Sequence, residues 1–144
     1  MASTLKINTL TGVTTAGSIA VTGEGNSTTT NLQQGLAKCW ADFNGSGTAA
    51  LTDSFNSGSF TDNGTGDYTV AYTSNMASGN YVFTGCNVYE GGTAGNIFTL
   101  TPKYGSADNR GASSVRMASV YDTQSTISHY DYEQQQFQVV GDLA

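Results

Sequence analysis

Residues 61–73 constrain the fold more than any other stretch of this chain. They read Thr-Asp-Asn-Gly-Thr-Gly-Asp-Tyr-Thr-Val-Ala-Tyr-Thr, a glycine-rich polar turn that leads directly into an alternating run. Asn-Gly accommodates the positive φ angles of a tight turn, and the two-residue alternation places Tyr68, Val70 and Tyr72 on one face of a strand. The stretch therefore predicts half of a β-hairpin with one buried face.

Similar runs, separated by turn residues at roughly ten-residue spacing, continue along residues 36–144. The expected strands are Leu36–Phe43, Ala50–Asn56, Ser59–Phe60, Tyr68–Thr73, Tyr81–Cys86, Ile97–Thr101, Ser114–Tyr121 and Phe137–Val140, with a glycine turn over residues 91–95. A helix over Thr30–Lys38 competes with the first strand because its residues are good helix formers, but we expect one short turn there at most. The spacing predicts an all-β domain, an antiparallel β-sandwich or a jelly-roll-like fold.

Residues 1–35 differ from the rest because they contain too few apolar residues to fold alone. Two strand-like patches, over residues 5–10 and 18–22, stand out in this polar zone. We expect an extended N-terminal segment that packs on the rest of the chain, pairs with neighbouring copies or docks on another protein, and its candidate contact residues are Leu5, Ile7, Leu10, Ile19 and Val21.

Composition narrows the possible partners. The net charge is −6, and the five Lys and Arg residues are scattered singly, so clustered cations for phosphate binding are missing and nucleic-acid binding is not expected. No run approaches the roughly 20 apolar residues that span a bilayer, which argues against membrane insertion. The N-terminus lacks the pattern of a signal peptide, so we expect synthesis in a cytoplasm.

The residues that carry chemistry form no recognisable catalytic or metal-binding pattern. Two cysteines and one histidine are too few for a standard zinc site, and Cys39 and Cys86 are expected to be buried thiols unless their strands are adjacent in an oxidising compartment. Acidic residues near the turns resemble N–H caps more than an acid–base pair or a calcium loop. We expect a protein without enzymatic activity, cofactor or metal.

An aromatic, hydroxyl-rich region late in the chain is the best candidate for surface contact. It contains Tyr121, His129, Tyr130 and Tyr132. Tyrosines with polar neighbours suit flat contacts with sugars or proteins, because they bury a large area at a small cost in rotamer entropy. The alternative is that these tyrosines complete the edge of the core.

Five ordered blocks resemble a family of small tail-fibre-like and virion structural proteins of marine and cyanobacterial bacteriophages. The blocks are residues 3–12, 35–48, 53–56, 61–73 and 139–142. The chain departs from the family at Cys39, where alanine is usual, and at Leu51–Thr52, where a β-branched and basic pair is usual. These differences concern packing and surface charge.

The resemblance implies a non-enzymatic building block exposed at the virion surface. In one hypothesis the chain is a short tail fibre or appendage and forms a homotrimer, as fibres commonly do. Its residues 1–35 then attach and trimerise, and residues 36–144 present loops to a host-surface glycan or protein. In the other it is a capsid decoration protein whose N-terminal segment grips the major capsid protein. Fold alone does not choose between them.

Overall fold

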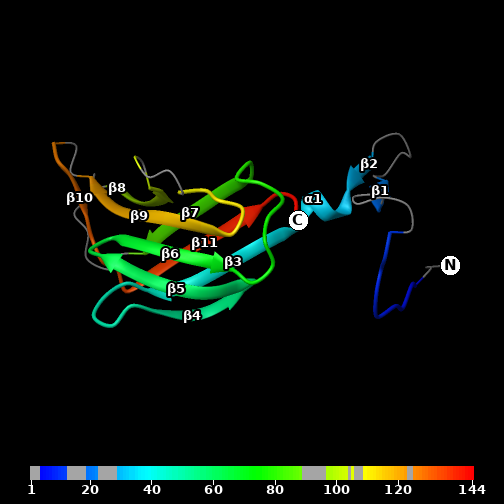
Figure 1. Cartoon of the computed structure of the whole chain (residues 1–144), viewed down its shortest axis with the longest axis horizontal. Coiled ribbons are helices and arrows are strands. Elements are labelled where there is room, and N and C mark those ends of the chain that lie inside the picture. Colours follow the sequence, from blue (N-terminus) through cyan, green and yellow to red (C-terminus); the bar gives the residue numbers. More distant parts are fainter. Residues whose placement is uncertain are drawn as a thin grey trace. The chain divides into compact units, whose positions relative to one another are not determined.

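The computed structural model describes residues 4–12, 19–22, 29–88, 97–103, 105, 109–122 and 125–144. The chain divides into two compact units, Met1–Leu36 and Ala37–Ala144, and each is described here by itself (Figure 1). Its regular structure is almost entirely β-strand, with one short helix.

The N-terminal unit contains a small antiparallel ribbon, β1 (Ala20–Thr22) paired with β2 (Thr29–Asn31). A single helical turn follows, α1 (Leu32–Gly35), whose first residue donates its backbone N–H to the carbonyl of Ile19 over 2.9 Å. Asn31 caps the turn, because its side-chain oxygen accepts the N–H of Gln34 over 3.1 Å. The expectation of one short turn is confirmed. The strand-like patch over residues 5–10 forms no strand in this single chain, where no described segment pairs with it.

Residues 37–144 form an antiparallel sandwich of two sheets, as expected from the spacing of the strands (Figure 1). The first sheet has the order β4-β3-β11-β7, with β3 (Ala37–Asn44), β4 (Ala50–Phe55), β7 (Val82–Val88) and β11 (Gln134–Val140). Its two central strands, β3 and β11, come from opposite ends of this unit, so long-range pairing closes the sheet.

The second sheet contains β5 (Ser57–Gly64), β6 (Asp67–Tyr72), β8 (Ile97–Pro102), β9 (Ser114–Asp122) and β10 (Ile127–His129). β9 pairs with β6, β8 and β10. Along β9, the partner strand changes from β6 to β10 at Ser119. The N–H of Ser119 donates to the carbonyl of Gly66 (2.9 Å), and its carbonyl accepts the N–H of Tyr130 (3.1 Å). The short strand β10 was not expected, since its sequence lies in a polar stretch without clear alternation. The expected glycine turn at 91–95 lies outside the described residues.

The core lies between the two sheets and follows the alternation of the strands. Tyr68, Val70 and Tyr72 are buried, as expected, and face the buried side of β3. Phe43 packs edge-on against Tyr68 with ring centroids 5.1 Å apart. Burial of each such large side chain contributes about 1.5–3 kcal/mol to folding.

A single residue, Asn56, turns the chain from the first sheet into the second. Its φ of 58° is positive, a conformation that asparagine tolerates better than most residues. The side-chain amide donates to the carbonyls of Lys38 and Ser74, each over 2.9 Å, and its oxygen accepts the N–H of Ser74 over 2.6 Å. Asn56 therefore ties β3 to the segment that follows β6.

The predicted hairpin is confirmed, but its tip lies further along than Asn63-Gly64. Gly64 pairs with Asp67, and Thr65 and Gly66 form the turn. Gly66 has φ of 60°, and a Cβ at this position would lie 2.5 Å from the Ser119 carbonyl oxygen. Glycine is needed there both for the backbone conformation and for the close approach of β9.

The two cysteines are free thiols on opposite faces of one sheet. Cys39 on β3 is buried in the core, whereas Cys86 on β7 is exposed, so the expectation that both are buried is wrong for Cys86. Strand pairing explains this difference, because Cys86 lies opposite Gln136 on β11 and shares its outward-facing side. Among the described residues, no helix is long and apolar enough to cross a membrane.

Candidate binding surfaces

The structure brings the late tyrosines together around Phe98 of β8. Tyr121 lies directly opposite Phe98 on the neighbouring strand, with ring centroids 5.3 Å apart. Tyr132 contacts the same ring edge-on at 5.7 Å, and Tyr130 lies 4.9 Å from Tyr132. These three tyrosines therefore form one packed aromatic cluster.

Only part of this cluster is available to a partner. Tyr130 is 48% exposed and His129 on β10 is also exposed, whereas Tyr121 is half-buried. The side chain of Tyr132 is only 2% exposed. Surface contact through Tyr132 is therefore incorrect, because its ring fills the space between Phe98 and Tyr130 instead of facing solvent.

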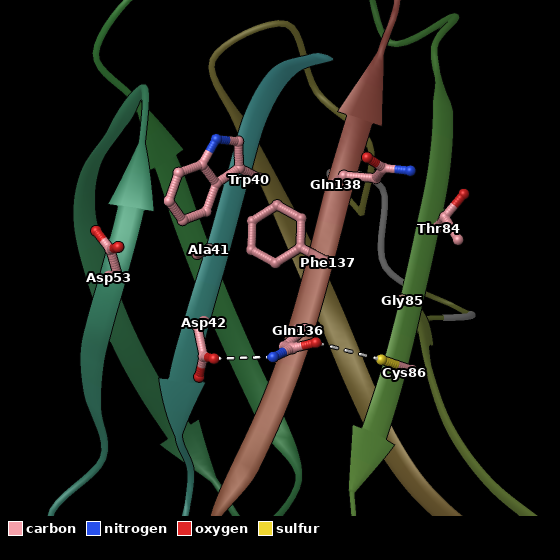
Figure 2. A pocket seen from close by; sticks show the side chains of 10 residues that line it. All are labelled: Trp40, Ala41, Asp42, Asp53, Thr84, Gly85, Cys86, Gln136, Phe137 and Gln138. Carbon is pink, nitrogen blue, oxygen red and sulfur yellow. Dashed lines mark hydrogen bonds between the residues drawn. The ribbon is translucent and has the colours of Figure 1, made fainter.

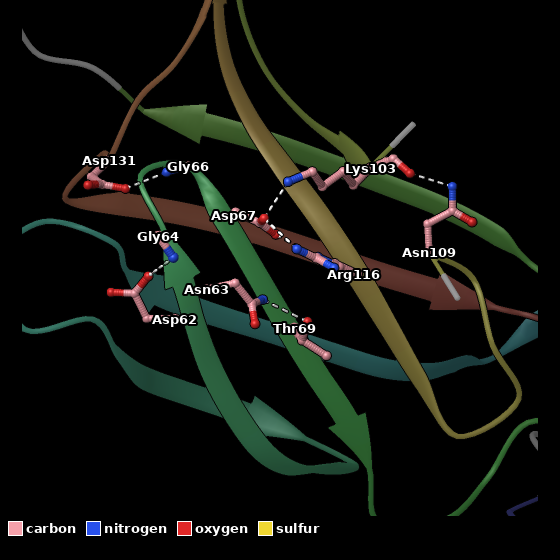
Figure 3. Close-up of polar contacts among 10 residues, drawn as sticks. All are labelled: Asp62, Asn63, Gly64, Gly66, Asp67, Thr69, Lys103, Asn109, Arg116 and Asp131. Carbon is pink, nitrogen blue, oxygen red and sulfur yellow. Dashed lines mark hydrogen bonds and ion pairs between the residues drawn. The ribbon is translucent and has the colours of Figure 1, made fainter. Parts of the chain in front are cut away.

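Asp131, between the two tyrosines, holds the hairpin tip in place. One carboxylate oxygen accepts the backbone N–H of Gly66 over 2.6 Å (Figure 3). The same oxygen accepts the hydroxyl of Tyr68 over 2.5 Å. Burial raises the pKa of Tyr68, and its hydrogen bond to Asp131 raises it further. A polar hollow of about 290 Å³ lies beside this carboxylate, lined by Ser46, Val88 and residues 130–134.

Asp67, another acidic residue near the turn, belongs to an ion-pair cluster on the outer side of the second sheet. Arg116 donates two hydrogen bonds to the carboxylate of Asp67, from Nε to Oδ1 over 2.8 Å and from Nη2 to Oδ2 over 2.7 Å (Figure 3). Lys103 forms a second ion pair with the same carboxylate. The hydrogen bonds from Arg116, followed by that from Lys103, lower the pKa of Asp67 to about 2 against the opposing effect of burial. This cluster joins β6 and β9 to the residue that directly follows β8, and its role is structural.

Asp62 also has a structural partner, since its carboxylate accepts the N–H of Gly64 over 2.9 Å (Figure 3). Asp62, Asp67 and Asp131 thus act on backbone groups or cations of their own chain, as expected for acidic residues near turns. Within the described part of the chain, no group of three or more His, Cys, Asp or Glu side chains is placed to hold a metal ion.

A second hollow, which the sequence analysis did not identify, lies on the outer face of the first sheet. It encloses about 450 Å³ and extends across all four strands (Figure 2). We call it the sheet groove; its outward-facing side chains are Trp40, Asp42, Asp53, Thr84, Cys86, Gln136 and Gln138. The sequence contained one indication of this surface. Because alternation along β3 buries Cys39, Ala41 and Phe43, the intervening side chains Trp40 and Asp42 must face outward.

The candidate attachment residues lie in the N-terminal unit. Leu5 is 79% exposed, and Ile7, Leu10 and Val21 are each more than half exposed. Ile19 is half-buried, next to the start of β1. Four of the five side chains thus present apolar surface to solvent.

Searches against known protein families, curated proteins and solved structures find no match to this chain.

Proposed function

We propose that this chain is a non-enzymatic structural protein of a bacteriophage virion, of the short tail-fibre or tail-appendage type. Residues 1–36 attach the protein to the particle and trimerise, and the sandwich presents a contact surface to the host. The five ordered sequence blocks support this role, as does the division into a small unit and a larger sandwich.

The observation that carries the proposal is the exposed apolar surface of the N-terminal unit. Leu5, Ile7, Leu10 and Val21 contribute side chains that are about half exposed or more in a segment whose only described ribbon has two three-residue strands. An isolated two-stranded ribbon is marginally stable in water. Pairing with other copies or with another virion protein would cover these side chains and the open strand edges.

Oligomerisation through this unit is tested by replacing Leu5, Ile7 and Leu10 together with serine. The proposal expects the parent protein to sediment as a trimer and the triple variant as a monomer, with unchanged near-ultraviolet circular dichroism from the sandwich. A matched control replaces Val82, an exposed residue of β7 in the sandwich, with serine. A parent protein that sediments as a monomer at all concentrations would refute trimerisation.

Location on the particle is tested by electron microscopy with gold-conjugated antibody against the sandwich. Gold at the tail is the expected result. Gold spread over the capsid would instead establish the alternative, a decoration protein whose N-terminal unit grips the major capsid protein, and a high copy number per particle would accompany it. Absence of the protein from purified particles would overturn both.

A further inference from the structure

We propose that the sheet groove is a binding site for a neutral oligosaccharide, with Trp40 as its stacking platform. This deepens the proposed role in host attachment by naming a ligand class and by placing the site on a sheet face. It relies on that role only for its biological setting, because binding by the purified protein is measured without a virion.

The size and construction of the groove are those of a ligand site. Its volume of about 450 Å³ lies within the range of roughly 300–1,000 Å³ typical of small-molecule sites. It is built on regular strands, whose side chains point outward in fixed rows (Figure 2). Rigid positioning of this kind lowers the entropic cost of binding.

Trp40 supplies the apolar surface of the groove. It is the only tryptophan of the chain, and 37% of it is exposed in the middle of a central strand. Its direct neighbours on the two flanking strands are Phe55 and Gln138. An indole that is partly open to solvent offers a flat face to the C–H side of a sugar ring, and its remaining area stays packed on the sheet.

The polar residues supply hydrogen-bonding groups beside that platform. Asp42 and Asp53 lie directly opposite each other on β3 and β4, a like-charge arrangement that destabilises a sheet. Asp42 accepts from Gln136 Nε2 over 2.8 Å, and Asp53 accepts the backbone N–H of Ser54 over 2.8 Å. Each carboxylate can accept further hydrogen bonds, so hydroxyl donors of a ligand would offset the repulsion between them.

The chemistry of these groups selects among ligand classes. Two carboxylates in a chain of net charge −6 disfavour sulfated, phosphorylated or sialylated chains. A small cation would favour an enclosed box of several aromatic rings, whereas Trp40 lies on an open sheet face with one aromatic neighbour, Phe55, on one side and the amide of Gln138 on the other. Separate donors and acceptors beside one flat apolar face match the alternating hydroxyl and C–H surfaces of a neutral sugar.

The first experiment titrates the purified full chain with cellotetraose, maltotetraose and a linear mannotetraose, and follows the fluorescence of Trp40. Since Trp40 is the only tryptophan, a saturable change reports on the groove itself. At least one sugar is expected to bind, while dextran sulfate and spermine are not. Saturable binding of spermine but of no sugar would replace the proposal with a cation site. No binding to these sugars or to an array of neutral glycans would overturn it.

Variants then locate the binding by calorimetry. Trp40→Ala is expected to weaken sugar binding about tenfold or more. The matched control is Ile127→Ala, which removes an exposed apolar side chain from β10 of the other sheet and should leave the affinity unchanged. An affinity that Trp40→Ala leaves unchanged would refute the groove.

A chemical block covers the case in which Trp40→Ala fails to fold. Cys86 lines the groove and is exposed, whereas Cys39 is buried, so N-ethylmaleimide should modify Cys86 alone in the folded protein. Modification is expected to abolish sugar binding with an unchanged circular dichroism spectrum, and Cys86→Ser should bind the sugar and resist the block. Full binding by the modified protein would overturn the proposal. These measurements are independent of the gold-labelling experiment, so the sugar site and the virion role can fail separately.

Discussion

The ion-pair cluster around Asp67 makes a quantitative prediction about stability and pH. Its carboxylate is 9% exposed and bound by both Arg116 and Lys103, and its pKa falls to about 2 from an ordinary 3.8. That difference corresponds to roughly 2.4 kcal/mol of folding free energy from the ionised form. We therefore expect Asp67→Asn to lower the free energy of unfolding at pH 7 by about 2–3 kcal/mol.

The pH dependence of this loss identifies its cause. Because the pKa of Asp67 is lower in the folded chain, the unfolded chain binds the proton more readily as the pH falls. The contribution of Asp67 is complete above about pH 5 and is mostly lost as the pH approaches 2. The difference between parent and variant should therefore shrink to below about 1 kcal/mol near pH 2.

Urea unfolding followed by circular dichroism, at several pH values from 7 to 2, measures this difference. Glu133→Gln is the control, since Glu133 is an exposed carboxylate outside the ion-pair cluster, and the free energy of unfolding of this variant should stay close to that of the parent across the range. A difference between parent and Asp67→Asn that stays constant over this range would refute the electrostatic reasoning. Packing of the side chain would then be the source of its effect.

Three other predictions concern the turns and the thiols. Gly66→Ala should lower the free energy of unfolding in urea by about 3 kcal/mol or more, because its Cβ would meet the Ser119 carbonyl. The control Gly47→Ala has a similar φ of 69° but open space around it, so it should lose only about 1 kcal/mol. Equal losses in the two variants would contradict the clash. Asn56→Ala should cost about 2–4 kcal/mol, and Asn56→Gly about 1 kcal/mol less if the positive φ contributes as argued. In a colourimetric thiol assay, Cys86 should react rapidly and Cys39 only on unfolding, since burial shields Cys39 and raises its pKa. Cys86→Ser should therefore remove the rapid phase. Two rapidly reacting thiols in the parent would show that Cys39 is accessible.

Local pattern in the sequence was sufficient to predict the sandwich and most of its strands. Alternation of large and small residues identified the buried face of β3 and of β6, because burial on one side of a strand leaves a two-residue period. The strand order was not predictable in this way, since the pairing of β3 with β11 joins residues about a hundred positions apart. The short β10 was missed because it pairs with the part of β9 that β6 does not reach, which the sequence alone does not reveal.

The candidate contact residues were predicted less well, for a related reason. A run of tyrosines in a polar stretch does not reveal which ring completes the core, and the ring of Tyr132 does so. The sheet groove depends on side chains from four strands, and only the register places Asp42 opposite Asp53 and Trp40 opposite Gln138. Sequence spacing indicated the outward face of each strand but not which strands would be neighbours.

Under the proposed role in attachment, the position of β3 has a mechanical consequence. β3 begins at Ala37, immediately after the N-terminal unit, and Trp40 and Asp42 lie only three and five residues further along the same strand. A pull on a molecule held by these side chains would travel to the N-terminal unit along one continuous backbone. Only three to five residues of β3 separate these side chains from the start of the strand, so such a load would bypass the other strands of the sandwich and leave their pairing unstrained.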